Sequence, residues 1–413
     1  MTETTLAGPT LADFEAAREV VARVVQTTPI ENSRHLSEVL GSPVLLKLEN
    51  LQRTGSYKIR GAYNRLAKLS AEERARGVVA ASAGNHAQGV AFAARELGIH
   101  ATIFMPLGVA LPKLQATKSY GADVILRGHT IEELLVAAEE FASATGAIFI
   151  PPFDHPDVVA GQGTLGLEIF DEVPDLDTII VPIGGGGLIS GIASALKQKA
   201  ASLGRTVRVI GVQAANAAAY PPSLVAGHPV DITVGATIAD GIAVGRPGAL
   251  NFAIIRDAVD EVVTVSEDDI AKAMVVLLER AKQVVEAAGA VASAAILAGA
   301  ISPAAGPTVS LLSGGNIDPL LMQRVISHGL AASDRYLKLR IMLPDRPGQL
   351  ARTSQIVAEA NANVVEVLHT RHGRGLQISQ VELEMSIETR GPDHRAEVVS
   401  KLREAGYDPI VDE

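Results

Sequence analysis

The sequence predicts an α/β protein: a core with a largely parallel sheet, followed by a small α+β domain. Two observations predict this fold class. Short β-rich runs alternate with helix-like stretches over residues 36–182, a pattern typical of parallel sheets covered by helices on both faces. After Leu330 the pattern changes to the element order βαββαβ, which is the order of ferredoxin-like domains.

Each predicted strand of the core is a short apolar run that is followed by a helix-like stretch. These strands are VLLKLE (44–49), GVVAAS (77–82), HATIFMP (100–106), ADVILRG (122–128) and DTIIVPI (177–183). Open parallel sheets bind ligands at the C-terminal ends of their strands. We therefore expect the functional residues directly after these runs.

The composition sets limits on the class of protein. A chain of 413 residues is long enough for two or three domains. The net charge is 36 − 46 = −10 without a long run of Lys or Arg, which argues against nucleic acid or a membrane surface as the main partner. The absence of cysteine excludes disulfides and thiolate chemistry and fits a cytoplasmic protein. The first residues lack the pattern of a secretory signal, and Thr10 with Asp13 predicts a helix cap.

Two long uncharged stretches raise the question of a membrane span. Prolines and glycines interrupt both of them, and each glycine inside a helix costs roughly 1 kcal/mol. We therefore expect residues 287–317 to form a buried helix and a buried strand, TVSLLS, and we expect no membrane partner.

The region after Leu330 is predicted to be a linker, 331–336, and a separate domain, 337–413. LKLRI and VELEMSIE alternate strictly, as strands do, while residues 347–360 are predicted to be helical. A lone domain of about 75 residues is marginally stable. We therefore expect it to pair with another copy, in a homodimer or a homotetramer.

Four consecutive glycines stand between the apolar run TIIVPI and the helix-like run LISGIASALKQK: Gly184, Gly185, Gly186 and Gly187. A strand, a glycine loop and a helix N-terminus together suit a phosphate. Leu188, Ile189 and Ser190 follow, where a nucleotide P-loop would have Lys and then Ser or Thr, so the phosphate would be an anchor and not a reactant. The alternative is a turn without chemical function.

Lys58 lies in the tight turn Gly55-Ser56-Tyr57-Lys58 and opens a predicted helix. A lysine in such a place can act as a Schiff-base nucleophile when burial lowers its pKa. The alternative is an ordinary solvent-facing lysine.

Four motifs in this order, TGSYKIRGA, SAGNHAQGVA, GGGGLISG and LLSGGN, resemble those of the fold-type II pyridoxal phosphate enzymes, specifically the threonine and serine dehydratases. The resemblance covers about residues 10 to 330. The part from LKLRIMLPDRPGQLA onward resembles ACT amino-acid-sensing domains. Together they look like the medium-length form of threonine ammonia-lyase. The resemblance implies a catalytic domain of residues 1–330 with two open, mostly parallel α/β subdomains, the smaller one, about 50–150, being inserted in the larger.

The resemblance also implies a role for each matched position. Lys58 would hold pyridoxal 5′-phosphate as a Schiff base and act in catalysis, and Tyr57 would lie against the ring. The phosphate would bind Gly184, Gly185, Gly186, Gly187 and Leu188. Asn85 would hydrogen-bond the ring oxygen, and Ser313 would meet the pyridine nitrogen.

The substrate carboxylate would bind the loop that contains Ser82, Gly84, Asn85 and His86, with Ser82 also counted among the catalytic residues. Considered alone, Ser82 is equally well a strand-end cap, and His86 a packed core histidine.

The implied reaction is β-elimination and deamination of L-threonine to 2-oxobutanoate and ammonia, with L-serine as a weaker substrate that gives pyruvate. The implied role is the first step of isoleucine biosynthesis. The alternatives are a serine dehydratase or racemase, a catabolic threonine dehydratase, a synthase that replaces a β- or γ-substituent, and a non-enzymatic amino-acid sensor.

Two positions depart from related serine racemases. Ala83 stands where those enzymes place a serine that donates a proton, so we expect little racemase activity. Gln213 and Ala219 stand where they place metal-binding carboxylates, so we expect no divalent metal site; a monovalent cation is left open.

The ACT resemblance implies an effector site in the loop after the first strand of that domain. We expect Asp345, Arg346, Gly348, Gln349 and Leu350 to bind isoleucine, with valine as an opposing ligand. The alternative is a dimerisation module without a ligand.

Overall fold

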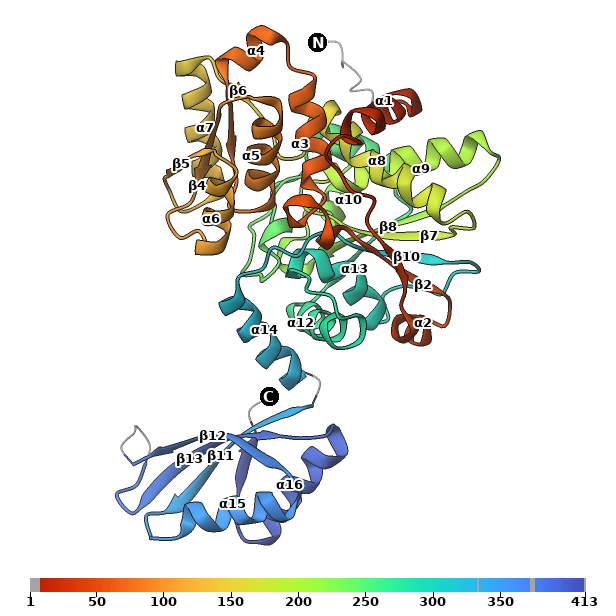
Figure 1. Cartoon of the computed structure of the whole chain (residues 1–413). Coiled ribbons are helices and arrows are strands. Elements are labelled where there is room, and N and C mark those ends of the chain that lie inside the picture. The colour runs from red at the N-terminus through yellow and green to blue at the C-terminus, as the bar shows by residue number, and fades with distance from the viewer. Residues whose placement is uncertain (1–7, 333, 372–375, 412–413) are drawn as a thin grey trace. The chain divides into compact units, whose positions relative to one another are not determined.

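The computed structural model describes residues 8–332, 334–371 and 376–411, and it consists of two compact units, Met1–Leu321 and Met322–Glu413 (Figure 1). The boundary falls within helix α14 (Pro319–Ala332). The expected linker 331–336 contains the end of this helix, residue 333, which lies outside the described residues, and the first residue of the next strand.

The larger sheet of the first unit has six strands in the order β1-β2-β10-β7-β8-β9. All neighbours are parallel except β1, which is antiparallel to β2. The strands are β1 (Ile30–Asn32), β2 (Val44–Leu48), β7 (Thr178–Pro182), β8 (Arg208–Ala214), β9 (Glu261–Val265) and β10 (Thr308–Leu312). The predicted runs VLLKLE, DTIIVPI and TVSLLS are thus confirmed as β2, β7 and β10.

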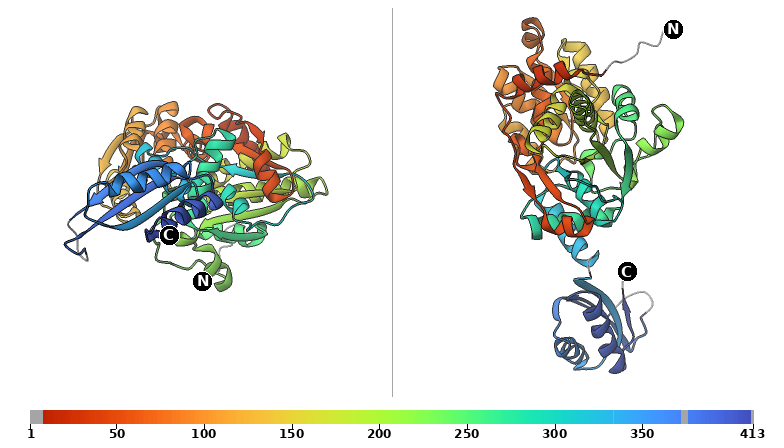
Figure 2. Two further views of the ribbon diagram at one scale, coloured as in Figure 1. Left: turned by 90° about the horizontal axis from the view of Figure 1, so that it is seen from below. Right: turned by 90° about the vertical axis from the view of Figure 1, so that its right-hand side faces the viewer.

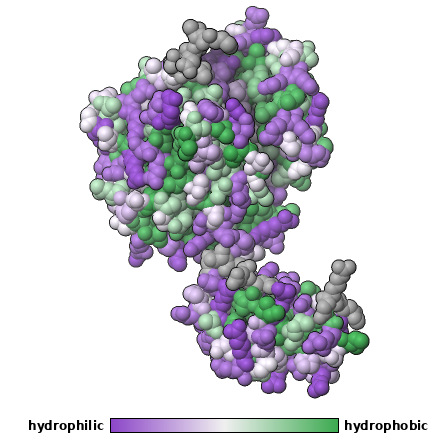
Figure 3. Space-filling view, turned by 180° about the vertical axis from the view of Figure 1, so that it is seen from behind, coloured by the Kyte–Doolittle hydropathy of each residue, from purple (hydrophilic) through white to green (hydrophobic). Residues whose placement is uncertain are grey.

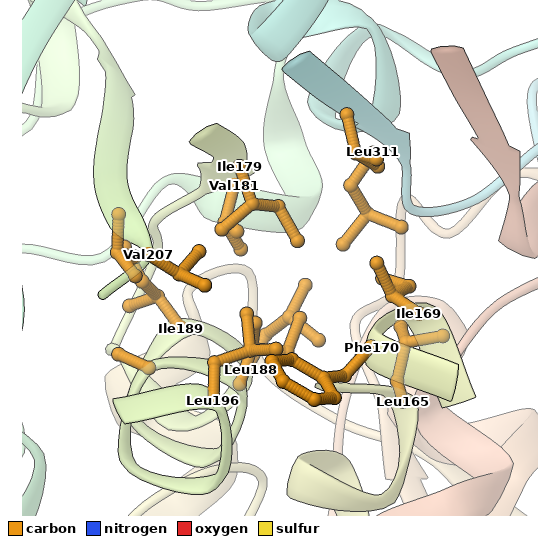
Figure 4. Packing of buried hydrophobic residues seen from close by; sticks show 14 of the residues in the cluster. Leu165, Ile169, Phe170, Ile179, Val181, Leu188, Ile189, Leu196, Val207 and Leu311 are labelled. Carbon is orange, nitrogen blue, oxygen red and sulfur yellow. The ribbon is translucent and has the colours of Figure 1, made fainter. Parts of the chain in front are cut away.

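Helices cover both faces of this sheet. On one face, α8 (Pro156–Glu172) and α9 (Gly187–Ser202) pack their leucine, isoleucine and phenylalanine side chains against β7 and β10 (Figure 4). On the other face α13 (Ala287–Leu297) lies between the sheet and α12 (Glu267–Val276), which is why its apolar residues extend all round the helix and ten of its eleven residues are buried. The expected buried helix and buried strand of the uncharged stretch are confirmed.

Further helices of this unit pack around those that cover the larger sheet: α1 (Leu11–Val21) contacts α8, α2 (Arg34–Leu40) contacts α13 and α11 (Ala249–Ala258) contacts α9. Thr10 and Asp13 form a capping box at the start of α1, as the sequence predicts. The unit also contains α10 (Tyr220–Ala226) and a π-helical turn at Leu277–Ala281.

The smaller sheet has four parallel strands in the order β5-β4-β3-β6 (Figure 1). Alternate residues of β3 point to opposite faces: Val78 and Ala80 pack against α3 and α5, and Val79 and Ala81 pack against α7. The elements are β3 (Val78–Ala81), β4 (Ala101–Met105), β5 (Asp123–Leu126), β6 (Ile148–Phe149), α3 (Lys58–Ala67), α4 (Ala71–Arg76), α5 (Asn85–Leu97), α6 (Leu111–Ser119) and α7 (Ile131–Thr145).

The second unit is an antiparallel sheet of four strands in the order β12-β13-β11-β14, and both of its helices pack on one face (Figure 2). The elements along the chain are β11 (Tyr336–Pro344), α15 (Gln349–Glu359), β12 (Asn363–Thr370), β13 (Gln380–Glu388), α16 (Pro392–Glu404) and β14 (Pro409–Val411). This is the predicted βαββαβ order, so the predicted fold class is confirmed for both units.

Hydrophilic side chains are interspersed with hydrophobic ones on both units in the view of Figure 3. Among the described residues, none of the helices has the length and apolar character that a membrane span requires.

A buried ion network supports the start of α3. The Arg60 guanidinium donates to both carboxylate oxygens of Glu49 at 2.8 Å and to Glu168 at 2.8 Å. Burial by itself would raise the pKa of Glu49, but the charge and hydrogen bonds of Arg60, together with Thr28 and Lys47, hold this pKa below its usual value. Lys47 binds the other oxygen of Glu168 at 2.6 Å. The network therefore ties α3 to β2 and α8.

We expect Arg60→Met to destabilise the first unit by about 3–5 kcal/mol, because removing one partner leaves a buried carboxylate without compensation. Urea denaturation followed by circular dichroism measures this change. Arg34→Met is the control, since Arg34 and Glu38 are exposed partners whose loss should change stability by less than about 1 kcal/mol. Equal losses in the two variants would show that the network does not support the fold.

Candidate active site

A cavity of about 690 Å³ lies in the first unit where the two sheets face each other with the C-terminal ends of their strands. Residues at the ends of β3, β7 and β10 and at the start of α3 line it. Every predicted site residue of the core lines it: Tyr57, Lys58, Ser82, Gly84, Asn85, His86, Gly184, Gly185, Gly186, Gly187, Leu188 and Ser313.

The turn before Lys58 is held against the loop that follows β10. The backbone N–H of Tyr57 donates to Ser313 O at 3.2 Å, and that of Gly315 donates to Gly55 O at 2.9 Å. Gly55 has a φ of 71°, which favours glycine, and Thr54 before it has 65°. These two positive φ values turn the chain sharply, so that α3 begins at Lys58 with its side chain in the cavity.

The Lys58 ammonium donates to Pro152 O at 3.0 Å and lies 5.3 Å from the centre of the Tyr57 ring. Burial lowers the pKa of Lys58 to about 8, and the nearby Glu286 carboxylate opposes this shift. The amine therefore loses its proton at a lower pH than an ordinary lysine, which is what a nucleophile or a base requires.

The four glycines form the start of α9. The first backbone hydrogen bond of this helix runs from Ser190 N to Gly186 O, so the amides of Gly187, Leu188 and Ile189 have no acceptor within the helix. Gly186 has a φ of 102°, and a Cβ there would meet the Tyr220 hydroxyl. Free first-turn amides that side chains cannot crowd are the features of a phosphate site.

Two side chains hold this loop through hydrogen bonds to the same carbonyl oxygen. The Tyr220 hydroxyl donates to Gly185 O at 3.1 Å, and Asn251 Nδ2 donates to the same oxygen at 3.2 Å. The loop is therefore shaped before any ligand binds.

The loop after β3 forms a second helix N-terminus at the cavity. Gln88 N donates to Gly84 O at 3.3 Å as the first bond of α5, so the amides of residues 85–87 have no acceptor within this helix. Gly84 N donates to Ser82 Oγ at 3.1 Å, which places the hydroxyl beside these amides. A carboxylate suits this group of donors.

His86 is held differently from its neighbours. Its Nε2 lies 3.0 Å from Ile150 O, and burial together with Lys58 lowers its pKa to about 3, so the ring is neutral and donates to that carbonyl. The ring is thus packed in the manner of a core histidine, although the residue borders the cavity.

Glu286, which is not among the predicted site residues, lines the same cavity. Asn85 Nδ2 donates to Glu286 Oε1 at 2.5 Å, and Asn316 Nδ2 donates to Asn85 Oδ1 at 2.8 Å. Burial raises the pKa of Glu286 to about 7, with a further contribution from Asp240. One signal was available in the sequence: Glu286 is the last charged residue before the uncharged stretch 287–317.

The residues expected to bind an effector lie together in the second unit, at the start of α15. Gly348 has a φ of 90° and precedes the helix, while Gln349 Oε1 accepts a hydrogen bond from the Tyr407 hydroxyl at 3.2 Å. Asp345 forms an ion pair with Arg371 at 3.4 Å. Arg346 and Leu350 are exposed.

Of the positions that depart from serine racemases, Ala83 lines the cavity. Gln213 accepts a hydrogen bond from Tyr220 N at 2.9 Å and donates to Ala217 O at 3.3 Å, so its amide holds the local backbone.

Comparison with known proteins identifies the class to which this fold and site belong. A family model described as pyridoxal-phosphate dependent enzyme matches residues 21–314, and an ACT domain model matches residues 338–406. The chain belongs to the pyridoxal-phosphate-dependent enzymes and carries a C-terminal ACT domain.

Individual relatives within this family include threonine ammonia-lyases and dehydratases. The L-threonine ammonia-lyase of Geobacter sulfurreducens is 48% identical over 394 residues, which are 95% of this chain and 97% of that protein. A catabolic L-threonine dehydratase of Escherichia coli is 46% identical over 74% of this chain and 92% of its own length. The solved structure of threonine deaminase isoform 2 from Solanum lycopersicum is 37% identical with a TM-score of 0.72, over 78% of this chain and 94% of that one. The resemblance to threonine ammonia-lyases is thereby confirmed.

The cavity fits the cofactor of this family. The first-turn amides of α9 suit its phosphate, and Lys58 is the amine of lowered pKa that would bind its aldehyde. Ser313 follows β10 and lines the cavity. If it meets the ring nitrogen, as the resemblance implies, its neutral hydroxyl would leave that nitrogen unprotonated. These individual roles remain predictions.

We expect Gly186→Ala to weaken pyridoxal phosphate binding about tenfold or more, because the methyl group would displace Tyr220 and strain the loop. Titration of the apoenzyme, followed by cofactor absorbance, measures this affinity. Gly204→Ala is the matched control: Gly204 also has a positive φ, 66°, but a Cβ there meets nothing within 4 Å. If both variants bind the cofactor as the wild type does, the loop is not its phosphate site.

We expect Glu286→Gln to lower the pKa of Lys58 below about 8, because the lost negative charge no longer stabilises the ammonium. In the apoenzyme, the rate at which Lys58 reacts with cyanate should therefore reach its midpoint at a lower pH. Glu132→Gln, an exposed carboxylate at the cavity edge, should leave the midpoint in place. A shift to higher pH in Glu286→Gln would contradict the assignment.

Proposed function

We propose that this enzyme converts L-threonine to 2-oxobutanoate and ammonia, and L-serine more slowly to pyruvate. One observation carries the proposal: an amine of lowered pKa, Lys58, shares one cavity with two helix N-termini, one suited to the cofactor phosphate and one to a substrate carboxylate. The names of the relatives support threonine as the substrate.

The chain's own residues supply binding, orientation and a base. The cofactor, when bound, withdraws electrons from the substrate Cα and so makes its proton acidic. The amides at the start of α5 and the Ser82 hydroxyl orient the substrate carboxylate. Lys58 Nζ, with a pKa of about 8, is the group that takes the Cα proton. The β-hydroxyl and one proton, equivalent to the proton taken from Cα, leave together as water. The resulting enamine, once released, takes up one water and gives the 2-oxo acid and ammonia.

The residue at position 83 favours elimination over racemisation. Ala83 lines the cavity on the loop after β3, and its methyl group cannot deliver a proton to the substrate. The proposal therefore includes little production of the D-enantiomer from L-serine.

The proposal extends to regulation. An amino acid bound near Asp345, Arg346, Gly348, Gln349 and Leu350 would control the enzyme, with isoleucine as the inhibitor and valine opposing it. Feedback inhibition by isoleucine suits an enzyme that catalyses the first step of isoleucine biosynthesis. We propose that the enzyme acts in the cytoplasm as a homodimer or a homotetramer. A catabolic role is the alternative, supported by the name of the Escherichia coli relative.

One assay tests these statements together. The holoenzyme should form 2-oxo acid from threonine faster than from serine, and Lys58→Ala should form none, because it lacks both the cofactor link and the base. Isoleucine should reduce the rate, valine should restore it, and Arg346→Ala should remove the response to isoleucine. Absence of 2-oxo acid from threonine in the wild type would refute the proposed activity, and an unchanged rate with isoleucine would refute the proposed regulation.

A further inference from the structure

The first unit has two halves, one built around the larger sheet and one around the smaller sheet. An ion pair connects these halves at the mouth of the cavity. Lys113 Nζ lies 2.7 Å from Asp240 Oδ2, and both residues line the cavity. Lys113 belongs to α6, which packs on α5 beside the smaller sheet, and Asp240 begins the short helix Asp240–Ile242. Neither residue stood out in the sequence analysis, and the proposed reaction does not use them.

Asp240 is fixed to the half that contains the larger sheet. Its short helix packs against α13, and a Cβ on Gly241 would lie 3.0 Å from the Ala288 side chain. On its other side the same helix lies against the glycine loop, since a Cβ on Gly184 would be 3.0 Å from Ile242 Cα. Asp240 thus has a defined position relative to the phosphate site.

Lys113 lies beside the loop that is suited to the substrate carboxylate. A Cβ on Gly84 would be only 3.5 Å from Lys113 Nζ. The side chain of Lys113 is 13% exposed while that of Asp240 is 55% exposed, so the pair stands where the cavity opens to solvent. Deeper in the cavity, the contact between Asn85 and Glu286 joins the same two halves.

The charges around the pair favour its formation. Asp240 and Glu286 are two carboxylates that line the cavity; the negative charge of Asp240 raises the pKa of Glu286, and the positive charge of Lys113 lowers it. Of the other lining cations, Arg246 pairs with Asp231, and Lys58 serves the cofactor. Lys113 is therefore the cation that balances Asp240 at the mouth.

We propose that Lys113 is a positioning residue whose ion pair with Asp240 holds the loop of residues 82–86 over the cavity, so that a substrate carboxylate meets the amides of α5. This inference rests on the proposed function, since it concerns how the amino-acid substrate is held. It assigns Lys113 no contact with the substrate.

The first test is a double-mutant cycle in the holoenzyme. Lys113→Met and Asp240→Asn should each raise KM for threonine about tenfold and change kcat less, and the double variant should resemble either single one. The exchanged pair, Lys113→Asp with Asp240→Lys, should recover much of the lost affinity, because it restores an ion pair in reverse. Lys197→Met is the matched control: Lys197 pairs with Asp260 at the same distance, 2.7 Å, outside the cavity lining, and its loss should leave KM in place.

Hydrogen exchange in the resting holoenzyme gives a readout that does not depend on the identity of the substrate. Residues 82–86 and 239–245 should exchange faster in Lys113→Met than in Lys197→Met. Unchanged exchange, or effects of the two single variants that add independently, would overturn the proposal. An exchanged pair that binds threonine as poorly as Lys113→Met would also overturn it, and would mean that the Lys113 ammonium binds the substrate carboxylate directly. If the enzyme forms no 2-oxo acid from threonine but Lys113→Met still speeds hydrogen exchange as expected, the result would contradict the proposed function alone.

Discussion

Strand β10 lies between β2 and β7 and runs parallel to both, and the whole site depends on this arrangement. Parallel strands end at the same edge of a sheet, so the chain segments that follow these three strands must meet there. The segment after β2 leads to Lys58, the one after β7 is the glycine loop, and the one after β10 begins with Ser313. Backbone hydrogen bonds between residues 55–57 and 313–315, together with one from the Asn316 side chain to Thr54 O, then fix the lysine relative to the sheet.

Three helix N-termini border the cavity. Helices α5, α9 and α13 all begin at its wall, and their first-turn amides favour anions. Anionic groups of a cofactor and a substrate would satisfy two of them. At the third, Glu286 is the residue that precedes α13, but its side chain does not cap the helix. Its carboxylate accepts a hydrogen bond from Asn85 instead, and burial raises its pKa to about 7.

Features that depend on neighbouring residues could be predicted from the sequence. The strands around 44–49 and 177–183, the helix that opens at Lys58 and the glycine loop all follow from local patterns, and the four motifs identified the family. Glu286 and the pair of Lys113 with Asp240 could not be predicted in this way. Their partners lie 201 and 127 residues away along the chain, so only the folded structure brings them together. For His86 the sequence left two alternatives open, a substrate-binding residue and a packed core histidine, and could not decide between them because the acceptor of the ring is a backbone carbonyl after β6.

The two halves of the first unit differ in how firmly they hold their share of the site. The glycine loop, residues 184–187, is fixed by Tyr220 and Asn251 within the larger half. The loop after β3, residues 82–86, belongs to the smaller half, which meets the larger one through side chains, at Asn85 with Glu286 and at Lys113 with Asp240. A cofactor that stays bound needs the fixed loop, whereas a substrate that enters and leaves in every turnover needs a loop whose contacts can open and re-form. These two side-chain contacts, a hydrogen bond and an ion pair at the solvent edge, meet that second requirement.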